Sequence, residues 1–369
     1  MHDQRAASLL AKVMAWDDVE SVQSILNRLQ LLADYKYDHY QRFEPGRRFI
    51  ESLALWLNQF EPADRSCALD LVTRRLVFFS DEEMSHLVRT AYPDLIVQER
   101  MRMVAEEYDL PTYRVGEISR HTRFHQLRLK SLYLGLSDGA RTNELRRASS
   151  GEISNEQIWQ AYELGDEKAQ DMLAELSKAF GKEGIKAERP RFNLVWLLDD
   201  FSGSGNTYIR YDNESKTFKG KIKKIYERLN RGDLVDRDHY EVFLLLYTAT
   251  RQAIDHIEYW SERFTSDHGF TPLKVRVLCP IEPDAALTRG VDAAHFHSLL
   301  SNSKYTDSKV ADEHFKVGGT DDPRRGFADC ALPVVLPHNT PNNSVYILWG
   351  PEQSAFAGLF PRVSRHREF

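Results

Sequence analysis

The sequence predicts an α/β protein with a doubly wound parallel sheet, preceded by a helical region and followed by a small β-containing subdomain. Three apolar runs carry this prediction, at residues 193–198, 240–247 and 273–279. The first run lacks polar alternation, as expected for a central parallel strand that is covered on both faces. A helical stretch over residues 250–264 separates the other two, and strands that alternate with helices favour parallel pairing.

Before the sheet, residues 1–110 are predicted to form a helical region. Apolar side chains at helical spacing would form one buried stripe, made of Phe49, Leu53, Trp56 and Phe60. Ser80 and Glu83 form a capping box, so a helix should begin at Asp81 and end near Pro93. Another helix is expected over residues 94–108.

The α/β core is expected over residues 111–285. It opens with an apolar strand over 132–136, followed by a tight turn and a helix. A second capping box, formed by Ser154 and Gln157, predicts helical sequence that continues to about Phe180.

Two hairpins are expected further along the chain. Residues 208–219 read as a hairpin with Asp-Asn as its turn, before a helix that begins at Lys221. The C-terminal region, residues 286–369, contains two apolar runs at 332–336 and 345–349. We interpret these runs as a small β-hairpin or as a hood-like subdomain packed beside the sheet.

Composition and charge exclude several classes of protein. The net charge of −6 argues against coating of nucleic acid, which needs a broad basic surface. The 3 cysteines lie far apart, and no pair has the spacing of a zinc site. The first ten residues carry charges and no long apolar core, so no signal peptide is expected. No window has the roughly 18 apolar residues of a membrane span. The sequence therefore indicates a cytoplasmic protein without membrane association.

The loop after the first apolar run of the sheet carries the clearest chemical signal. It reads Asp199-Asp200-Phe201-Ser202-Gly203-Ser204-Gly205-Asn206-Thr207. In open parallel sheets, ligands bind outside the carboxyl ends of the strands. Glycines let consecutive N–H groups converge on an anion, and the short polar side chains add further donors. The paired carboxylates would repel a phosphate, but they suit sugar hydroxyls and a magnesium ion. The loop therefore predicts a binding site for a ribose 5-phosphate group.

Other loop types fit this segment less well. A Walker A loop needs a lysine after its second glycine, and none follows Gly205. A dinucleotide fingerprint needs a third glycine where Tyr208 stands, and a phosphatase of the haloacid dehalogenase type needs an acid in place of Phe201. A tight polar turn that caps a helix explains the glycines and serines, but it does not explain the paired acids.

Residues 199–207 resemble the motif with which type I phosphoribosyltransferases bind phosphoribosyl pyrophosphate (PRPP). In that family a hydrophobic strand leads to two acids and a Ser/Thr-Gly-rich loop that ends in threonine. The strand, turn and helix over 132–147 are similar in position to the family's pyrophosphate loop. More narrowly, the stretch ending at Arg141, the loop 199–205, and residues 337–349 with 360–362 resemble phosphoribosyltransferase-like proteins of prokaryotic anti-phage gene clusters.

The resemblance implies a ligand and a role for each matching residue. The chain would bind PRPP or a nucleotide with a ribose 5-phosphate group, together with Mg²⁺. Asp199 and Asp200 would hold the ribose hydroxyls and the metal, directly or through those hydroxyls, and would act in catalysis with Arg141. The 5-phosphate would be bound by Ser202, Gly203, Ser204, Gly205, Asn206 and Thr207. The pyrophosphate would face Ser137, Asp138 and Gly139 together with Arg141.

Further residues allow two interpretations each. His338, Asn339, Asn342 and Asn343 would recognise a base, since amides supply donors and acceptors, or they are turn residues. Two basic stretches, at 114–130 and 219–224, would attract a polyphosphate or a nucleic-acid backbone, or form solvated helix faces.

Two departures from the family pattern divide the functional hypotheses. A hairpin follows Thr207 where the enzymes begin a helix, and the flexible catalytic loop of the enzymes is not evident between the two motifs. The complete loop at 199–207 favours an enzyme that transfers a phosphoribosyl group or hydrolyses the same bond, as an effector or accessory component of anti-phage defence. The missing flexible loop favours a non-catalytic PRPP or nucleotide sensor that regulates a protein or nucleoprotein partner, or an effector that acts on nucleotides or RNA ends. A homo-oligomer is compatible with each hypothesis.

Overall fold

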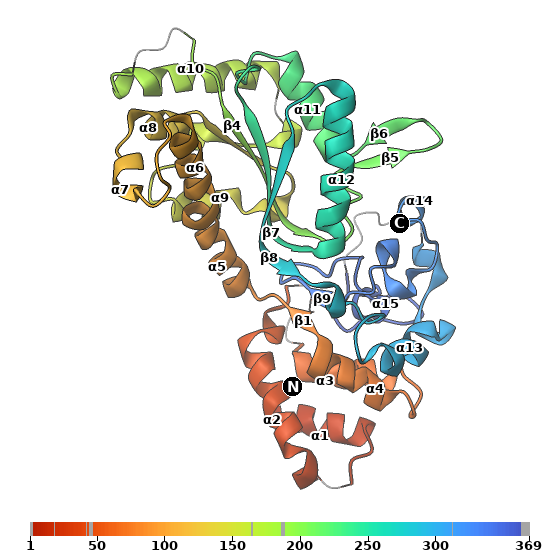
Figure 1. Cartoon of the computed structure of the whole chain (residues 1–369). Coiled ribbons are helices and arrows are strands. Elements are labelled where there is room, and N and C mark those ends of the chain that lie inside the picture. Colours follow the sequence, from red (N-terminus) through yellow and green to blue (C-terminus); the bar gives the residue numbers. More distant parts are fainter. Residues whose placement is uncertain are drawn as a thin grey trace. The chain divides into compact units, whose positions relative to one another are not determined.

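The computed structural model describes residues 3–17, 19–41, 43, 47–163, 165–185, 189–311 and 313–362 (Figure 1). The chain forms two compact units, one of residues 1–83 with 282–369 and one of residues 84–281. The expected domains 1–110, 111–285 and 286–369 stay a prediction, and each compact unit is described by itself below.

Residues 84–281 contain a five-stranded parallel sheet with the strand order β3-β2-β4-β7-β8. Its strands are β2 (Ser131–Gly135), β3 (Ile158–Gln160), β4 (Leu194–Ser202), β7 (Glu241–Thr250) and β8 (Leu273–Ile281). The three predicted apolar runs are β4, β7 and β8, and β4 is the central strand. The prediction of an α/β protein on a parallel sheet is therefore confirmed.

Helices cover both faces of this sheet. On one face, Leu134, Leu197 and Leu244 lie in register and share a core with α10, α11 and α12. On the other face, Trp196 lies in register with Phe243, and the Arg276 side chain of β8 donates to Glu99 on α6. Figure 1 shows α6 and α8 on the opposite side of the sheet from α12. A central strand enclosed in this way needs apolar residues on both faces, which explains the unbroken run in β4.

The helices of this region account for most of its remaining length. They are α5 (Asp81–Ala91), α6 (Gln98–Glu107), α7 (Val115–Ile118), α8 (Thr122–Leu129), α9 (Thr142–Ala148), α10 (Asp166–Lys182), α11 (Lys221–Arg231) and α12 (Arg251–His268). Short 3₁₀ turns lie at Asp138–Ala140, Asn155–Gln157 and Ala161–Glu163. The expected capping box is present, because Ser80 N donates to Glu83 Oε2 at 2.8 Å and Glu83 N to Ser80 Oγ at 3.1 Å.

The helix was predicted to end near Pro93, but the chain stays helical through this proline. Helix α5 does end at Ala91, but a π-helical turn over Tyr92–Val97 joins it directly to α6. Proline lacks the N–H donor of an α-helical interior, and the wider π turn accommodates it without a break.

The prediction of helix from Ser154 to about Phe180 is wrong in its first part. The capping box of Ser154 and Gln157 is present, but it opens only a 3₁₀ turn. Residues 158–160 then form β3, which pairs with residues 133–135 of β2. Tertiary pairing at the sheet edge overrides the local helical signal, and α10 begins only at Asp166.

The hairpin expected over residues 208–219 is confirmed, although its turn is residues 213–216 rather than Asp-Asn, because Asp212 still pairs with Thr217. Strands β5 (Arg210–Asp212) and β6 (Thr217–Lys219) pair antiparallel, and Asp212 Oδ1 accepts from the N–H groups of Glu214 and Ser215 in the turn. Helix α11 follows at Lys221, as expected.

The second compact unit joins the two ends of the chain. Its helices and strands are α1 (Asp3–Val13), α2 (Val19–Tyr35), α3 (Phe49–Asn58), α4 (Arg65–Asp70), β1 (Val77–Phe78), α13 (Ala293–Ser301), α14 (Glu313–Lys316), β9 (Val334–Val335) and α15 (Tyr346–Trp349). A π turn lies at Leu71–Arg75, and 3₁₀ turns lie at Tyr37–His39, Pro283–Ala285, Ser303–Tyr305, Ser308–Val310, Pro323–Arg325 and Phe327–Asp329. The predicted stripe is buried, with Phe49, Leu53, Trp56 and Phe60 each at most 2% exposed.

The predicted C-terminal hairpin is wrong. The run 332–336 supplies β9, which pairs parallel with β1, and the run 345–349 forms the short helix α15. Both runs are fully buried, and a short buried run has the same apolar pattern in a strand as in a helix.

None of the described helices combines the length and the apolarity that a membrane-spanning segment requires.

Candidate functional site

The paired acids of the predicted loop lie near the carboxyl end of the central strand. Strand β4 extends to Ser202, so Asp199 and Asp200 belong to the strand and the turn begins at Gly203. Asp199 is 2% exposed and Asp200 is 8% exposed. Both carboxylates therefore lie at the carboxyl end of β4, where open parallel sheets bind ligands.

Asp199 accepts hydrogen bonds from three segments of the chain. Its Oδ1 accepts from Ser137 Oγ, and its Oδ2 accepts from Tyr208 OH at 2.8 Å and from Lys221 Nζ at 3.0 Å. The carboxylate thus joins the end of β2, the chain after the predicted phosphate loop, and the start of α11.

Asp200 has a different environment. Its Oδ1 accepts from the Phe201 N–H at 2.8 Å, and the backbone of Gly139 lies against the carboxylate. Burial, followed by the charge of Asp199, raises the pKa of Asp200 to about 7, although backbone hydrogen bonds and Lys221 act in the opposite direction. Two adjacent buried carboxylates do not both ionise easily, so one proton is retained near neutral pH.

The predicted pyrophosphate loop lies beside these acids, at the end of the neighbouring strand β2. Ser137 Oγ accepts from Gly139 N at 3.2 Å, and Ala140 O accepts from the buried Tyr247 OH at 2.8 Å. Arg141 has the left-handed backbone angle φ 46°, which is strained for a residue with a side chain. Ser137 and Gly139 are therefore brought to Asp199 and Asp200, while Asp138 is exposed.

The Arg141 side chain is held away from open solvent. Its Nη1 lies 3.3 Å from Glu144 Oε2 and 3.4 Å from Ser85 Oγ. The role of Arg141 as a donor to a leaving group stays a prediction.

The predicted phosphate loop packs against the start of α12. Thr250 Oγ1, which caps this helix, donates to Gly203 O at 2.6 Å. Gly205 has φ 80°, and a Cβ atom there would lie 3.0 Å from Ala253 O, so glycine is required at this position. Ser202 and Ser204 are buried, whereas Asn206 is half-buried and Thr207 is exposed. The start of a long helix beside the loop favours anion binding.

The segment after the loop supplies contacts that the sequence did not predict. The backbone N–H groups of Lys221 and Ile222 donate to Thr207 O at 3.2 Å and to Tyr208 O at 2.9 Å. The hairpin thus places the first residue of α11 beside Asp199. In the sequence, the basic stretch 219–224 indicated that Lys221 could lie near an anion site. No sequence feature indicated that Tyr208 would contact Asp199.

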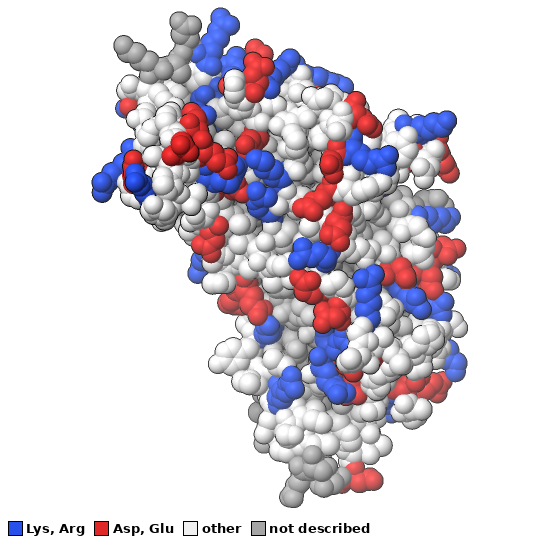
Figure 2. Space-filling view, viewed as in Figure 1, with Lys and Arg blue, Asp and Glu red and all other residues white. Residues whose placement is uncertain are grey.

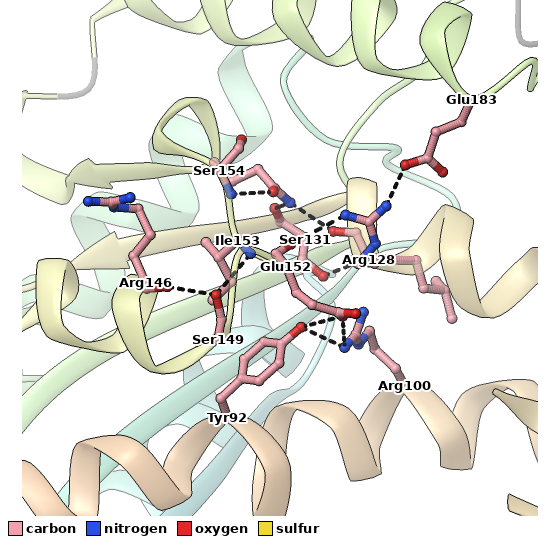
Figure 3. Close-up of polar contacts among 12 residues, drawn as sticks. Tyr92, Arg100, Arg128, Ser131, Arg146, Ser149, Glu152, Ile153, Ser154 and Glu183 are labelled. Carbon is pink, nitrogen blue, oxygen red and sulfur yellow. Dashed lines mark hydrogen bonds and ion pairs between the residues drawn. The ribbon is translucent and has the colours of Figure 1, made fainter.

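The segment between the pyrophosphate loop and α10 is fixed by polar contacts (Figure 3). Glu152 Oε2 accepts from Tyr92 OH at 2.8 Å and from the fully buried Arg100 at 3.3 Å. Ser149 Oγ accepts from Ile153 N at 3.0 Å. Further along, Gln157 Nε2 donates to the carbonyl oxygens of residues 128, 129 and 131. Residues 149–157 thus connect α9 to β3 through anchored turns.

The four residues predicted for base recognition belong to the other compact unit. Asn343 is 8% exposed, and its Nδ2 donates to Phe327 O at 3.2 Å. Asn342 O accepts from Phe327 N at 2.6 Å, and Asn339 Oδ1 accepts from Thr340 N at 3.1 Å. The contact of Asn339 is local, as in a turn, whereas Asn342 and Asn343 join their segment to the distant Phe327. Base recognition by them and by His338 stays a prediction.

The two basic stretches have acidic neighbours. Arg114, Arg123 and Arg128 pair with Glu117, Glu107 and Glu183. Lys219 and Lys223 pair with Asp212 and Glu227. Figure 2 shows basic and acidic side chains intermixed over the face in view. Local pairing of this kind favours solvated helix faces over a continuous nucleic-acid track.

The two carboxylates of the site supply some, but not all, of the ligands that a hard cation such as Mg²⁺ needs. Within the described ranges, no group of three or more His, Cys, Asp and Glu side chains is arranged to hold a metal ion. Asp199 and Asp200 nevertheless present carboxylate oxygens, which Mg²⁺ prefers, and Mg²⁺ commonly takes its other ligands from water and substrate phosphates. Both oxygens of Asp199 already accept hydrogen bonds, so Asp200 is the acid of the pair that better fits a magnesium ion arriving with a phosphorylated ligand.

Comparison with known proteins identifies a family. Residues 53–362 match the family model described as PRTase-CE, and this range includes the two loops and parts of both compact units. No curated protein and no solved structure matches the chain.

Proposed function

The chain belongs to the PRTase-CE family of phosphoribosyltransferase-like proteins, and from this premise we propose that it binds PRPP or a nucleotide with a ribose 5-phosphate group. The ligand would lie at the carboxyl ends of β2 and β4. The 5-phosphate would be bound by residues 202–207, and a pyrophosphate group by residues 137–141.

The contact between the two loops is the observation that carries this proposal. Ser137 donates to Asp199, and the backbone of Gly139 lies against Asp200. The two segments are 62 residues apart in sequence but meet beside the central strand. A ligand with phosphate groups at both ends of a ribose requires two anion-binding loops around a polar centre of this kind.

Magnesium is part of the proposal. Asp200 would hold the ion directly or through the ribose hydroxyls, with Asp199 beside it. When bound, the ion supplies charge neutralisation on the pyrophosphate. The chain's own residues bind and orient the sugar, and the Arg141 guanidinium would stabilise negative charge on the departing group.

An enzyme and a sensor are the two candidate functions at this site. In an enzyme, the bond from the anomeric carbon to the pyrophosphate oxygen breaks, the bonding electrons leave with pyrophosphate, and a base nitrogen or a water oxygen attacks the carbon. The anchored segment 149–157 favours the sensor, because it offers no long loop to close over the ligand. The resemblance to proteins of anti-phage gene clusters supports a role in defence for either function, through a protein or nucleoprotein partner.

Ligand binding is tested by thermal unfolding with PRPP or ribose 5-phosphate and magnesium. A ligand that binds only the native state increases the free energy of unfolding, by about 2.7 kcal/mol at a ligand concentration of 100 times Kd, and therefore raises the melting temperature. The wild type should show this shift, and Asp200→Asn and Gly203→Val should lose most of it. A wild type without any shift would contradict the proposal.

Enzyme and sensor are then separated by product analysis. Pyrophosphate release from PRPP, with each common base and with water as acceptor, would identify an enzyme. Binding without release would identify a sensor. In a phage-plating assay, loss of protection by Asp200→Asn would connect the site to defence, and full protection by this variant would contradict that connection.

A further inference from the structure

Lys221 has a fixed position beside the acids of the site. It is the first residue of α11, and its Nζ lies 3.0 Å from Asp199 Oδ2. Gly220, the residue before it, has φ 122°, and a Cβ atom there would lie 2.3 Å from Tyr208 O. The backbone therefore turns sharply at Gly220, and this turn fixes the direction in which the Lys221 side chain projects from the start of the helix.

The ammonium group lies at the junction of the two anion loops. Asp199, which accepts from Lys221, accepts on its other oxygen from Ser137 of the pyrophosphate loop. The backbone N–H of Lys221 also donates to Thr207 O, at the end of the phosphate loop. Its side chain is 31% exposed, against 3% for Asp199, so the lysine is much less buried than the acid with which it pairs.

A structural role alone accounts poorly for this lysine. A partly buried ion pair gains little net stability, because desolvation offsets the attraction between the charges. A lysine ammonium carries three N–H donors; Asp199 accepts one of them, and the centre of the Tyr208 ring lies 5.3 Å from the nitrogen. A phosphorylated ligand that approaches two adjacent carboxylates meets repulsion, which a nearby cation offsets.

We propose that Lys221 is a ligand-binding residue of the ribose-phosphate site, that it contacts a phosphate group of the ligand, and that Asp199 is a positioning residue which holds it there. Asp200 is then the carboxylate that faces the sugar. This inference rests on the proposed function, and it assigns different tasks to two acids that the family motif treats alike.

The first test compares the affinities of matched variants for ribose 5-phosphate and PRPP by isothermal titration calorimetry. Lys221→Met removes the charge, Lys221→Arg retains it, and Lys223→Met is the control on the same helix, where Lys223 pairs with Glu227. We expect Lys221→Met to bind at least tenfold more weakly, Lys221→Arg to recover most of the affinity, and Lys223→Met to bind as the wild type does. Equal affinities for Lys221→Met and wild type would overturn the inference while leaving the proposed function intact. A wild type that binds neither ligand would overturn both.

A second variant addresses folding, because Lys221→Met leaves the Asp199 charge buried without its partner. The double variant Asp199→Asn/Lys221→Met removes both charges and should fold, yet it should still bind weakly. Full affinity in the double variant would overturn the inference.

The third test needs no substitution. The wild type is acetylated with a lysine reagent with and without PRPP, and modification is measured by mass spectrometry. PRPP should protect Lys221 severalfold and leave Lys223 unprotected. Equal modification of Lys221 in both samples would show that its ammonium does not contact the ligand.

Discussion

The backbone of Gly139 lies directly against the carboxylate of Asp200, since a Cβ atom at Gly139 would lie only 2.3 Å from Asp200 Oδ2. Gly139 follows strand β2, and Asp200 lies near the carboxyl end of the neighbouring central strand β4. The absence of a side chain at one residue thus permits the two loops to share a single polar centre.

The first prediction concerns this close approach. Gly139→Ala should force the Asp200 carboxylate to move and should abolish the PRPP-induced shift in melting temperature, at a cost in stability of about 1–3 kcal/mol. Gly116→Ala is the control, because no atom lies within 4 Å of a Cβ atom at that position. The assignment of Gly139 to the ligand site fails if the alanine variant keeps the full ligand shift.

The second prediction concerns the pH dependence of stability. Burial and the neighbouring Asp199 raise the pKa of Asp200 to about 7 from 3.8. Between these values the folded chain binds a proton that the unfolded chain does not bind. The free energy of unfolding should therefore fall as pH rises from about 4 to 7, and this contribution should be absent above that range. Urea unfolding across this range should give a flatter profile for Asp200→Asn than for wild type. Parallel profiles for the two proteins would show that Asp200 does not cause this pH dependence of stability.

Bound ligand should reverse this trend if it requires ionised Asp200. PRPP with magnesium should then bind more tightly as pH rises through about 7. Calorimetric titrations at pH 6 and pH 8 measure the change, and a pH-independent affinity would show that the ligand does not use this carboxylate.

The sequence predicted the parts of the site that depend on local pattern. Asp199 and Asp200 follow an unbroken apolar run, and the structure places that run in the centre of the sheet and the two acids at the edge where open parallel sheets bind ligands. The hairpin after Thr207 was also predictable, because Asp212 begins its turn and accepts hydrogen bonds from the N–H groups of Glu214 and Ser215, although the turn is residues 213–216 rather than Asp-Asn.

The features that the sequence did not predict depend on contacts between segments that are distant along the chain. Strand β3 forms only because residues 158–160 pair with β2, and a run of three residues carries no clear signal of its own. The approach of Lys221 and Tyr208 to Asp199 follows from the path of the hairpin in space, which spacing along the chain does not reveal. Similarly, the buried stripe around Trp56 was predictable, but its partner near residue 347 was not.

The third prediction concerns the anchored segment in Figure 3. Glu152 Oε2 accepts from Tyr92 and from Arg100, whose side chain is fully buried. Glu152→Gln should leave the Arg100 charge without its acidic partner and should lower the free energy of unfolding by about 1–3 kcal/mol. This loss is smaller than that expected for breaking a fully buried ion pair, because Glu152 is half exposed. Glu183→Gln is the control; it breaks the pair with Arg128, whose side chain is partly exposed, and should cost less than about 1 kcal/mol. Chemical denaturation measures both, and equal effects would show that Glu152 does not compensate the buried Arg100.

The fourth prediction concerns the unit built from both chain ends. Trp56 Nε1 donates to Ile347 O at 2.8 Å, and the rings of Phe49 and Phe360 stack with centroids 5.8 Å apart. Removal of residues 1–109 would therefore expose the C-terminal half of this core, including Tyr346 and Leu348, which have no exposed surface.

Each large apolar side chain left in water would cost about 1.5–3 kcal/mol, so a chain of residues 110–369 should aggregate. A chain of residues 84–281 has its own sheet and core, and it should stay soluble and keep part of the PRPP-induced stabilisation. Expression yield, size-exclusion profile and thermal shift compare the two fragments with the full chain. A soluble, monodisperse 110–369 fragment would show that the two chain ends do not depend on each other for folding. An 84–281 fragment that folds but ignores PRPP would show that ligand binding also needs residues of the other unit.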